Sequence, residues 1–272
     1  MTLPDCQELL LKLEDGVLHI TLNRPHKRNA MNSRLVDEMM AVFTAIEKER
    51  GVRAVVLRGA EGNFCAGGDI SGMNDRKTDI DGQPINAEQA AWNFNRSFGH
   101  MITKVNHAPQ VVICVLEGAV LGGGFGLACI SDIAIADVGA TLAMPETGLG
   151  IIPAQIAPFV VMRVGLTQAR RLALTGERIK GDAAQEMGLV HFVTKGEEAL
   201  STQLASVITG VKRCAPEANA QTKELMLQVG KGDLENLLDK ASDMFSVALR
   251  GPEGQEGTRA FIEKRKPNWS VK

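Results

Sequence analysis

The amino-acid sequence predicts an α/β fold. Residues 53–58 and 111–116 are almost continuously apolar and rich in branched side chains, as strands covered on both faces of a sheet are. Segments with apolar residues at helical spacing alternate with such strands, and this alternation indicates a sheet with helices packed on it. Beyond about residue 195 only helical patterns follow, so a helical region is expected after the α/β part.

The first half of the chain predicts a clear order of elements. Residues 16–23 alternate and are expected to form a strand that ends at a turn before Pro25. Asn32 offers an N-cap for an amphipathic helix at 35–50. The strand at 53–58 is then followed by a glycine-rich turn, a polar loop at 71–86 that we expect to be mobile, and a helix at 87–105.

The second half starts with the strand at 111–116, which leads into another glycine-rich turn and a helix of small residues through Ala128. A further strand is expected at 133–136. The helical region is predicted as four helices, at 197–207, 216–229, 234–249 and 254–265. Because no Pro- or Ser-rich linker precedes it, this region is expected to pack on the core or on another subunit.

Composition excludes several classes of function. The chain has 272 residues, 44% of them hydrophobic, so a sizeable core is expected. Its 30 basic and 32 acidic residues give a net charge of -2, which favours neither nucleic acid nor an anionic membrane as a partner. Five scattered cysteines, no signal-like N-terminus and no long apolar run predict a reduced cytoplasmic protein, unless a leader has been removed.

Two glycine-rich turns, at 64–70 and 117–124, are the features most suggestive of chemistry. Each follows a strand and presents backbone N–H groups with few side chains to shield them, so together they could form one oxyanion hole. Taken singly, each turn could merely permit a tight bend or close packing. The usual glycine motifs for dinucleotides and phosphates are absent, as are the G-x-S-x-G and H-E-x-x-H signatures of serine and zinc chemistry, so no metal site is expected.

Four segments together are more specific than either turn. They are Asn23 to Ala30, Ala66-Gly67-Gly68-Asp69, Leu121-Gly122-Gly123-Gly124 and Pro145 to Gly150. In this order and spacing, and with the ending from Glu256 to Pro267, the chain resembles the crotonase (enoyl-CoA hydratase/isomerase) superfamily over nearly its entire length.

The resemblance implies a spiral core of ββα units, placed here at 1–195, and a C-terminal helical oligomerisation region at 196–272. It implies a homotrimer or a dimer of trimers, and an acyl-CoA thioester as substrate, with coenzyme A as part of the substrate and no separate cofactor. By position in the motifs, the N–H groups of Gly68 and Gly123 would hold the oxygen of a thioester enolate.

The resemblance also implies which residues surround the substrate. His26, Arg28 and Ala30 would lie beside the CoA moiety, where Arg28 or Lys27 could meet a phosphate. Phe261 and Lys264 match positions near the nucleotide that a neighbouring subunit could supply, although a solvated helix end explains them equally well. Asp69 is expected to be a turn carboxylate rather than a catalyst. The remaining positions expected at the site are Ala66, Ile70, Leu121, Gly122, Pro145, Leu149 and Gln155.

The chain departs from the family pattern at one carboxylate. Hydratases of the family typically use two glutamates; the one in the Pro-Glu turn is present as Glu146, but Gly126 stands where the other belongs. A hydratase would then replace the missing group with the substrate itself or with an acid such as Asp75 or Glu88. A Δ3,Δ2-enoyl-CoA isomerase would need Glu146 alone, and a CoA-binding protein with weak or no activity is a further alternative.

The stretch at 150–158 is similar to that of hydratases acting on branched, carboxylated enoyl-CoAs of the glutaconyl type. In that reading Gln155 would face the additional carboxylate of the acyl chain. Burial among apolar neighbours is expected to raise the pKa of Glu146, which would suit a group that both takes and gives a proton near neutrality.

Overall fold

Six strands form the main sheet, in the order β1-β2-β3-β4-β6-β9. The computed structural model describes residues 1–70 and 85–270, so the loop expected at 71–86, with Asp75, falls almost wholly outside the described residues. β1 and β2 are antiparallel, whereas the remaining neighbours run parallel. The strands of this sheet are β1 (Leu9–Glu14), β2 (Val17–Leu22), β3 (Ala54–Gly59), β4 (Val111–Leu116), β6 (Ile133–Asp137) and β9 (Phe192–Thr194).

The strands predicted from the sequence are confirmed as β2, β3, β4 and β6. The strands at 119–121, 141–143, 179–180 and 192–194 were not predicted, and neither was β1. It pairs with β2 across the two-residue turn Asp15-Gly16, in which both residues have positive φ, +50° and +71°. Such a turn matches the twist of a hairpin, and Asp-Gly is among its most favoured sequences. The Asp15-Gly16 dipeptide was therefore the signal in the sequence from which β1 could have been predicted.

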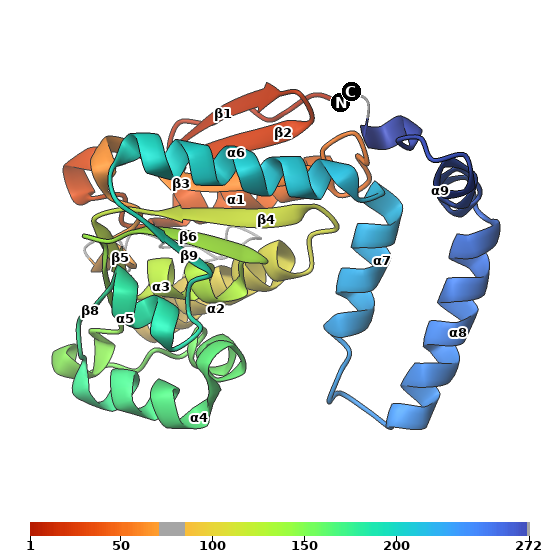
Figure 1. The fold of residues 1–272 in the computed structure, drawn as a ribbon. Coiled ribbons are helices and arrows are strands. Elements are labelled where there is room, and N and C mark those ends of the chain that lie inside the picture. Colours follow the sequence, from red (N-terminus) through yellow and green to blue (C-terminus); the bar gives the residue numbers. More distant parts are fainter. Residues whose placement is uncertain (71–84, 271–272) are drawn as a thin grey trace.

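The main sheet is buried on both faces. Alternate residues such as Val56, Ile113 and Val115 pack against helix α6 (Glu197–Arg213), which lies along one face in Figure 1. The residues between them, such as Leu57 and Cys114, belong to the larger core on the other face. That core is closed by α1 (Ser33–Ile46), α2 (Ala87–Asn106) and α3 (Gly123–Ile130). Burial on both faces explains the continuous apolar runs in these strands.

A smaller sheet lies beside the main one, in the order β5-β7-β8. Its strands are β5 (Ala119–Leu121), β7 (Thr141–Ala143) and β8 (Ile179–Lys180). The helices α4 (Ala157–Thr175) and α5 (Gly181–Glu186) lie at this end of the molecule (Figure 1). Because β5 leads into the second glycine turn and β7 leads into the Pro-Glu turn, this sheet brings those two turns together.

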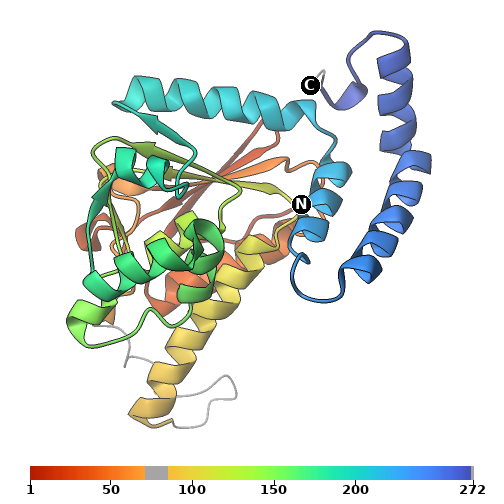
Figure 2. The same ribbon diagram turned by 60° about the horizontal axis from the view of Figure 1, so that its bottom comes forward.

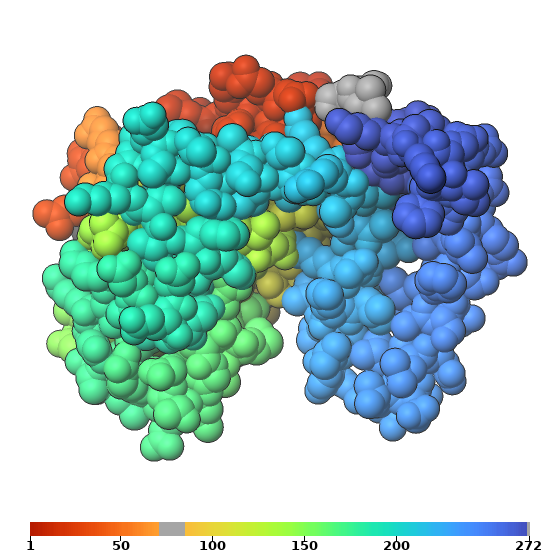
Figure 3. Space-filling model, in the orientation of Figure 1, coloured from red at the N-terminus to blue at the C-terminus, as the bar shows by residue number. Residues whose placement is uncertain are grey.

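Three helices extend beyond α6 as an arm, seen from two directions in Figures 1 and 2. They are α7 (Pro216–Met226), α8 (Leu234–Arg250) and α9 (Pro252–Ile262). The ion pair of Lys223 with Asp132, 2.6 Å long, ties α7 to the body. The space-filling view shows a hollow between the body and the arm (Figure 3). The four helices predicted after residue 195 are thus present. α6, α7 and α8 begin where expected, whereas α6 ends at Arg213 instead of 207 and α9 spans 252–262 instead of 254–265.

Short 3-10 turns complete the described ranges: η1 (Pro25–Lys27), η2 (Ala60–Gly62), η4 (Glu146–Leu149) and η5 (Asn268–Ser270). Within those ranges no helix has both the length and the apolar character that crossing a bilayer requires.

Candidate active site

The two glycine turns lie side by side. Cys65 and Val120 form an isolated parallel bridge between them. The Cys65 N–H donates to the Ala119 carbonyl, and the Leu121 N–H donates to the Cys65 carbonyl, each at 2.8 Å. These hydrogen bonds fix the register of the two turns, so Gly67-Gly68 stands next to Gly122-Gly123.

Glycine is required where the turns approach each other. Gly67 and Gly122 have φ values of +103° and +51°, which side chains rarely adopt. A Cβ on Gly122 would lie 3.5 Å from the Gly67 Cα and 2.9 Å from Oε1 of Glu146. The glycines therefore permit a contact of backbone with backbone and of backbone with a carboxylate.

The hydrogen bonds of the turns leave two N–H groups available. The Asp69 N–H donates to the Met31 carbonyl and the Gly122 N–H to the Ala143 carbonyl. Among the described residues, no backbone acceptor is found for the N–H of Gly68 or of Gly123. Gly123 also begins α3, so the positive end of that helix adds to the attraction for a negatively charged oxygen.

Glu146 stands beside this pair of donors. It is the first residue of η4, separated from β7 by Met144 and Pro145, and its Oε1 lies close to Gly122. Its Oε2 is buried and has no hydrogen-bond partner among the residues that the structure describes. Burial raises the pKa of the Glu146 carboxyl above its ordinary value, in the direction expected from the sequence.

Both turns and Glu146 line one cavity of about 130 Å³. The site residues expected from the sequence that the structure brings together at this cavity are Ala66, Gly68, Ile70, Gly122, Gly123, Pro145, Glu146, Leu149 and Gln155. Its walls are mostly apolar. Among its described lining residues, the polar side chains are those of Asn95, Glu146 and Gln155.

Other expected site residues lie outside the cavity lining. His26, Lys27 and Arg28 are exposed at η1, next to the first glycine turn, where the Arg28 carbonyl accepts from the Ala66 N–H at 2.9 Å. This exposed position is compatible with the CoA contacts that the resemblance implies. Leu121 contributes backbone to the contact between the turns, and its N–H is already bonded to Cys65.

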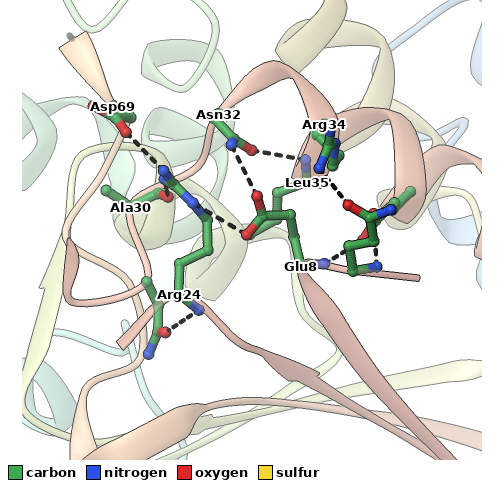
Figure 4. Close-up of polar contacts among 10 residues, drawn as sticks. Glu8, Arg24, Ala30, Asn32, Arg34, Leu35 and Asp69 are labelled. Carbon is green, nitrogen blue, oxygen red and sulfur yellow. Dashed lines mark hydrogen bonds and ion pairs between the residues drawn. The ribbon is translucent and has the colours of Figure 1, made fainter. Parts of the chain in front are cut away.

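Asp69 and Ala30 are joined by a buried arginine (Figure 4). Arg24 forms ion pairs with Asp69, at 2.9 Å, and with Glu8, at 3.2 Å, and it also donates to the Ala30 carbonyl. The arginine thus links the segment just before β1, the segment after β2 and the end of the first glycine turn. Asp69 has a structural role in holding that turn, and it does not line the cavity.

Phe261 and Lys264 lie at the end of α9, far from the cavity within this chain. Figure 1 places α9 at the opposite edge of the molecule from β5 and α4. Phe261 is 85% exposed. A contact of these residues with a substrate would therefore have to be made in another subunit, as the sequence-based hypothesis allowed.

Several cavity residues were missed from the sequence. Phe94, Asn95 and Phe98 come from α2, and the other lining residues that were not predicted are Met31, Val36, Ile151, Ile152, Pro153, Ala154 and Ile156. The spacing of Phe94 and Phe98 on one face of the predicted helix was the available signal. Glu88, considered as a second acid, is exposed in the first turn of α2 and does not line the cavity.

The geometry of two N–H donors, a buried carboxylate and an apolar cavity agrees with comparisons of the whole chain. A family model described as enoyl-CoA hydratase/isomerase matches residues 12–272. The chain belongs to the enoyl-CoA hydratase/isomerase family. The short-chain-enoyl-CoA hydratase of Clostridium acetobutylicum is 33% identical to this family member over 268 residues, covering 96% of this chain and 97% of its own. The 1,2-epoxyphenylacetyl-CoA isomerase of Escherichia coli is 29% identical over 265 residues, covering 97% and 98%.

Solved structures of the family share the architecture. Pseudomonas aeruginosa AtuE is 52% identical, with a TM-score of 0.91 over 97% of this chain and 100% of its own. An enoyl-CoA hydratase/isomerase from Marinobacter aquaeolei is 50% identical, with a TM-score of 0.91 and the same coverage. The α/β crotonase fold expected from the sequence is thereby confirmed, and the protein is an enzyme of the hydratase/isomerase family.

Proposed function

We propose that this enzyme adds water to a 2-enoyl-CoA thioester, with Glu146 transferring the protons and the N–H groups of Gly68 and Gly123 holding the enolate oxygen. The observation that carries the proposal is the Glu146 carboxylate, which is partly buried and lies beside both glycine turns in one cavity, with no hydrogen-bond partner for its Oε2 among the described residues. Leaving such a group without a partner costs stability, so its retention at this place argues for use in chemistry.

A single carboxylate can balance the protons of the reaction. Glu146 removes a proton from water as the water oxygen bonds to C3 of the enoyl group, and the electrons of the double bond move toward the thioester oxygen. The protonated Glu146 then gives a proton to C2, which restores the thioester and the ionised carboxylate. The raised pKa makes Glu146 a stronger base, which favours the first half of this cycle, the removal of a proton from water.

The enolate formed between these steps carries negative charge on the thioester oxygen. Two preorganised N–H donors in a largely apolar cavity would stabilise it by several kcal/mol, since removing one such donor in other enzymes costs about 3 to 4 kcal/mol. The proton transfers and the oxyanion contact involve no oxidation or reduction. We therefore propose coenzyme A as part of the substrate and no separate cofactor.

The isomerase alternative rests on a specific observation, the lack of a second carboxylate beside the cavity in the described part of the chain. At Gly126, the position of the usual glutamate, the side chains of Ile156 and Ile102 occupy the space that a side chain would need. A Cβ there would lie 2.3 Å from Cγ2 of Ile156 and 3.1 Å from Cδ1 of Ile102. An isomerase would use Glu146 to move one proton between two carbons. We rank it second because a 33% identical relative, from Clostridium acetobutylicum, is a short-chain-enoyl-CoA hydratase.

For the acyl chain we propose a branched, carboxylated enoyl group of the glutaconyl type. Gln155, expected from the sequence to face the additional carboxylate, lines the cavity together with Asn95. The remaining lining supports the branched, apolar part of such a chain, since Phe94, Phe98, Ile152 and Ile156 surround it.

The deciding experiment compares a 2-enoyl-CoA with its 3-enoyl isomer, each in a glutaconyl-type and an unbranched neutral form. We expect loss of absorbance of the conjugated thioester from the 2-enoyl substrate, which signals hydration. A gain of absorbance from the 3-enoyl substrate, without hydration, would establish the isomerase instead. Efficient hydration of crotonyl-CoA with no turnover of 3-methylglutaconyl-CoA would exclude the proposed acyl chain.

We also propose that the chain assembles as a trimer through its helical arm. Large apolar residues of α8 are exposed in the single chain, among them Leu234 at 61% and Phe245 at 68%. Large apolar side chains exposed together on one helix are typical of an interface with another chain. Light scattering coupled to size exclusion should give three or six times the mass of the chain. Phe245→Asp should shift the measured mass toward that of a single chain. A wild-type protein of single-chain mass would contradict the proposal.

A further inference from the structure

Three polar side chains form a hydrogen-bonded row between α2 and the segment before α4. Nη1 of Arg96 lies 3.4 Å from Oε1 of Gln155, and Nε2 of Gln155 donates to Oδ1 of Asn95 at 2.8 Å. Asn95 and Gln155 both line the substrate cavity, whereas Arg96 stands behind them. Of these three residues, only Gln155 was predicted from the sequence to lie at the site.

The guanidinium of Arg96 fixes the direction of the hydrogen bonds in this row. Arginine only donates hydrogen bonds, so it holds the carbonyl oxygen of Gln155 toward itself. The amide nitrogen of Gln155 is thereby turned onto the carbonyl oxygen of Asn95, and the amide nitrogen of Asn95 remains as a donor. The polar end of the cavity thus presents N–H donors backed by a positive charge, which suits an acceptor that carries negative charge.

Gly99 makes room for this arrangement. It lies inside α2, where glycine costs roughly 0.5 to 1 kcal/mol relative to alanine. A Cβ at Gly99 would lie 2.0 Å from Oε1 of Gln155 and 2.6 Å from Nη1 of Arg96. Because Gly99 has no side chain, the Gln155 carboxamide and the Arg96 guanidinium can meet over the helix backbone. This contact explains why glycine occupies a position at which it lowers the stability of the helix.

We propose that Arg96, Gln155 and Asn95 form a carboxylate-binding subsite for the acyl chain. Asn95 and Gln155 donate to the acyl carboxylate, and Arg96 is a positioning residue that orients both amides and supplies the positive charge. This inference rests on the proposed function, because it assumes that the acyl group occupies this cavity. It deepens that function by naming the residues that separate carboxylated from neutral acyl chains.

The test uses saturated thioesters, which bind without reacting. Calorimetry on the full-length enzyme would compare glutaryl-CoA and adipyl-CoA with pentanoyl-CoA and hexanoyl-CoA, chains matched in length that differ in the terminal carboxylate. Wild-type enzyme is expected to prefer at least one carboxylated chain. Arg96→Met should weaken its binding about 10- to 100-fold, as expected for a charge-assisted contact, and change the neutral partner less than about threefold.

Two further variants separate recognition from folding. Arg96→Lys should keep much of the preference, because it retains the charge. Lys104→Met removes a cation from the same helix that instead pairs with Glu47 at 3.4 Å, and it should change neither Kd. Gly99→Ala should weaken binding of the carboxylated chain selectively, because it displaces Gln155.

Other outcomes overturn the inference. They are a wild-type enzyme with no preference for any carboxylated chain, an equal loss of both ligands in Arg96→Met, or the same selective loss in Lys104→Met. Failure of the proposed function looks different: no 2-enoyl-CoA would be hydrated, while the binding preference and its loss in Arg96→Met would persist.

Discussion

Glu146→Gln is expected to lower kcat for a 2-enoyl-CoA about a thousandfold, because general acid-base catalysis contributes about 10²- to 10⁴-fold and this carboxylate serves in both directions. The Kd for a saturated acyl-CoA should change less than about threefold. Glutamine keeps the size of the side chain, and the contact of Oε1 with Gly122 is preserved by the amide oxygen. The loss should therefore appear in turnover rather than in affinity.

Stopped-flow turnover and calorimetry on the same preparations measure the two quantities. Glu186→Gln is the matched control, since it removes an exposed glutamate of α5 that does not line the cavity. Turnover that survives in Glu146→Gln would contradict the assigned role. A wild-type protein that binds the thioester but turns over neither the 2-enoyl nor the 3-enoyl form would favour a CoA-binding protein without activity.

The same variant should report the pKa of Glu146 through stability. A carboxyl whose pKa is raised in the folded state binds its proton more tightly there than in the unfolded state. Between the ordinary pKa and the raised one, the wild type therefore loses unfolding free energy as the pH rises, a loss that glutamine cannot show. Urea unfolding at pH 4 and pH 8 should show Glu146→Gln gaining stability relative to wild type at the higher pH.

Local sequence patterns predicted the parts of the site that depend on backbone conformation. Gly67, Gly68, Gly122 and Gly123 lie in short turns after apolar strands, and Glu146 follows a proline within its own turn. Each of these features is encoded within a few residues. The turns meet because the strands before them are neighbours in two sheets. Of these strands, β3 and β4 were predicted from the sequence, whereas the short strands β5 and β7 were not.

Contacts between distant segments could not be predicted in the same way. Gln155 meets Asn95 and Arg96 about sixty residues away, across the interior of the cavity. The sequence of α2 alone does not indicate that another side chain packs over Gly99. A glycine inside a helix can also be one that the helix tolerates without any packing role. The role of Ile156 beside Gly126 was hidden for the same reason.

Gly126→Glu is expected to destabilise the enzyme by about 4 kcal/mol or more rather than to restore a hydratase pair. α3 is buried around position 126, and the first side-chain atom alone would lie 2.3 Å from Cγ2 of Ile156. Overpacking costs about 1 to 3 kcal/mol, and burial of a carboxylate without a partner adds to it. Urea unfolding should show the lowered midpoint, and the hydration rate should not rise.

A graded series makes the cause visible. Gly126→Ala should already destabilise, because its Cβ meets Ile156, and adding Ile156→Ala should recover part of the loss by removing Cγ2. Gly232→Glu is the control, since the space around that glycine is open and it lies on the surface. A Gly126→Glu enzyme with wild-type stability and faster hydration would show that the residues around position 126 can move to accommodate the glutamate. The single-carboxylate mechanism would then reflect the missing side chain alone, with no contribution from the shape of the cavity.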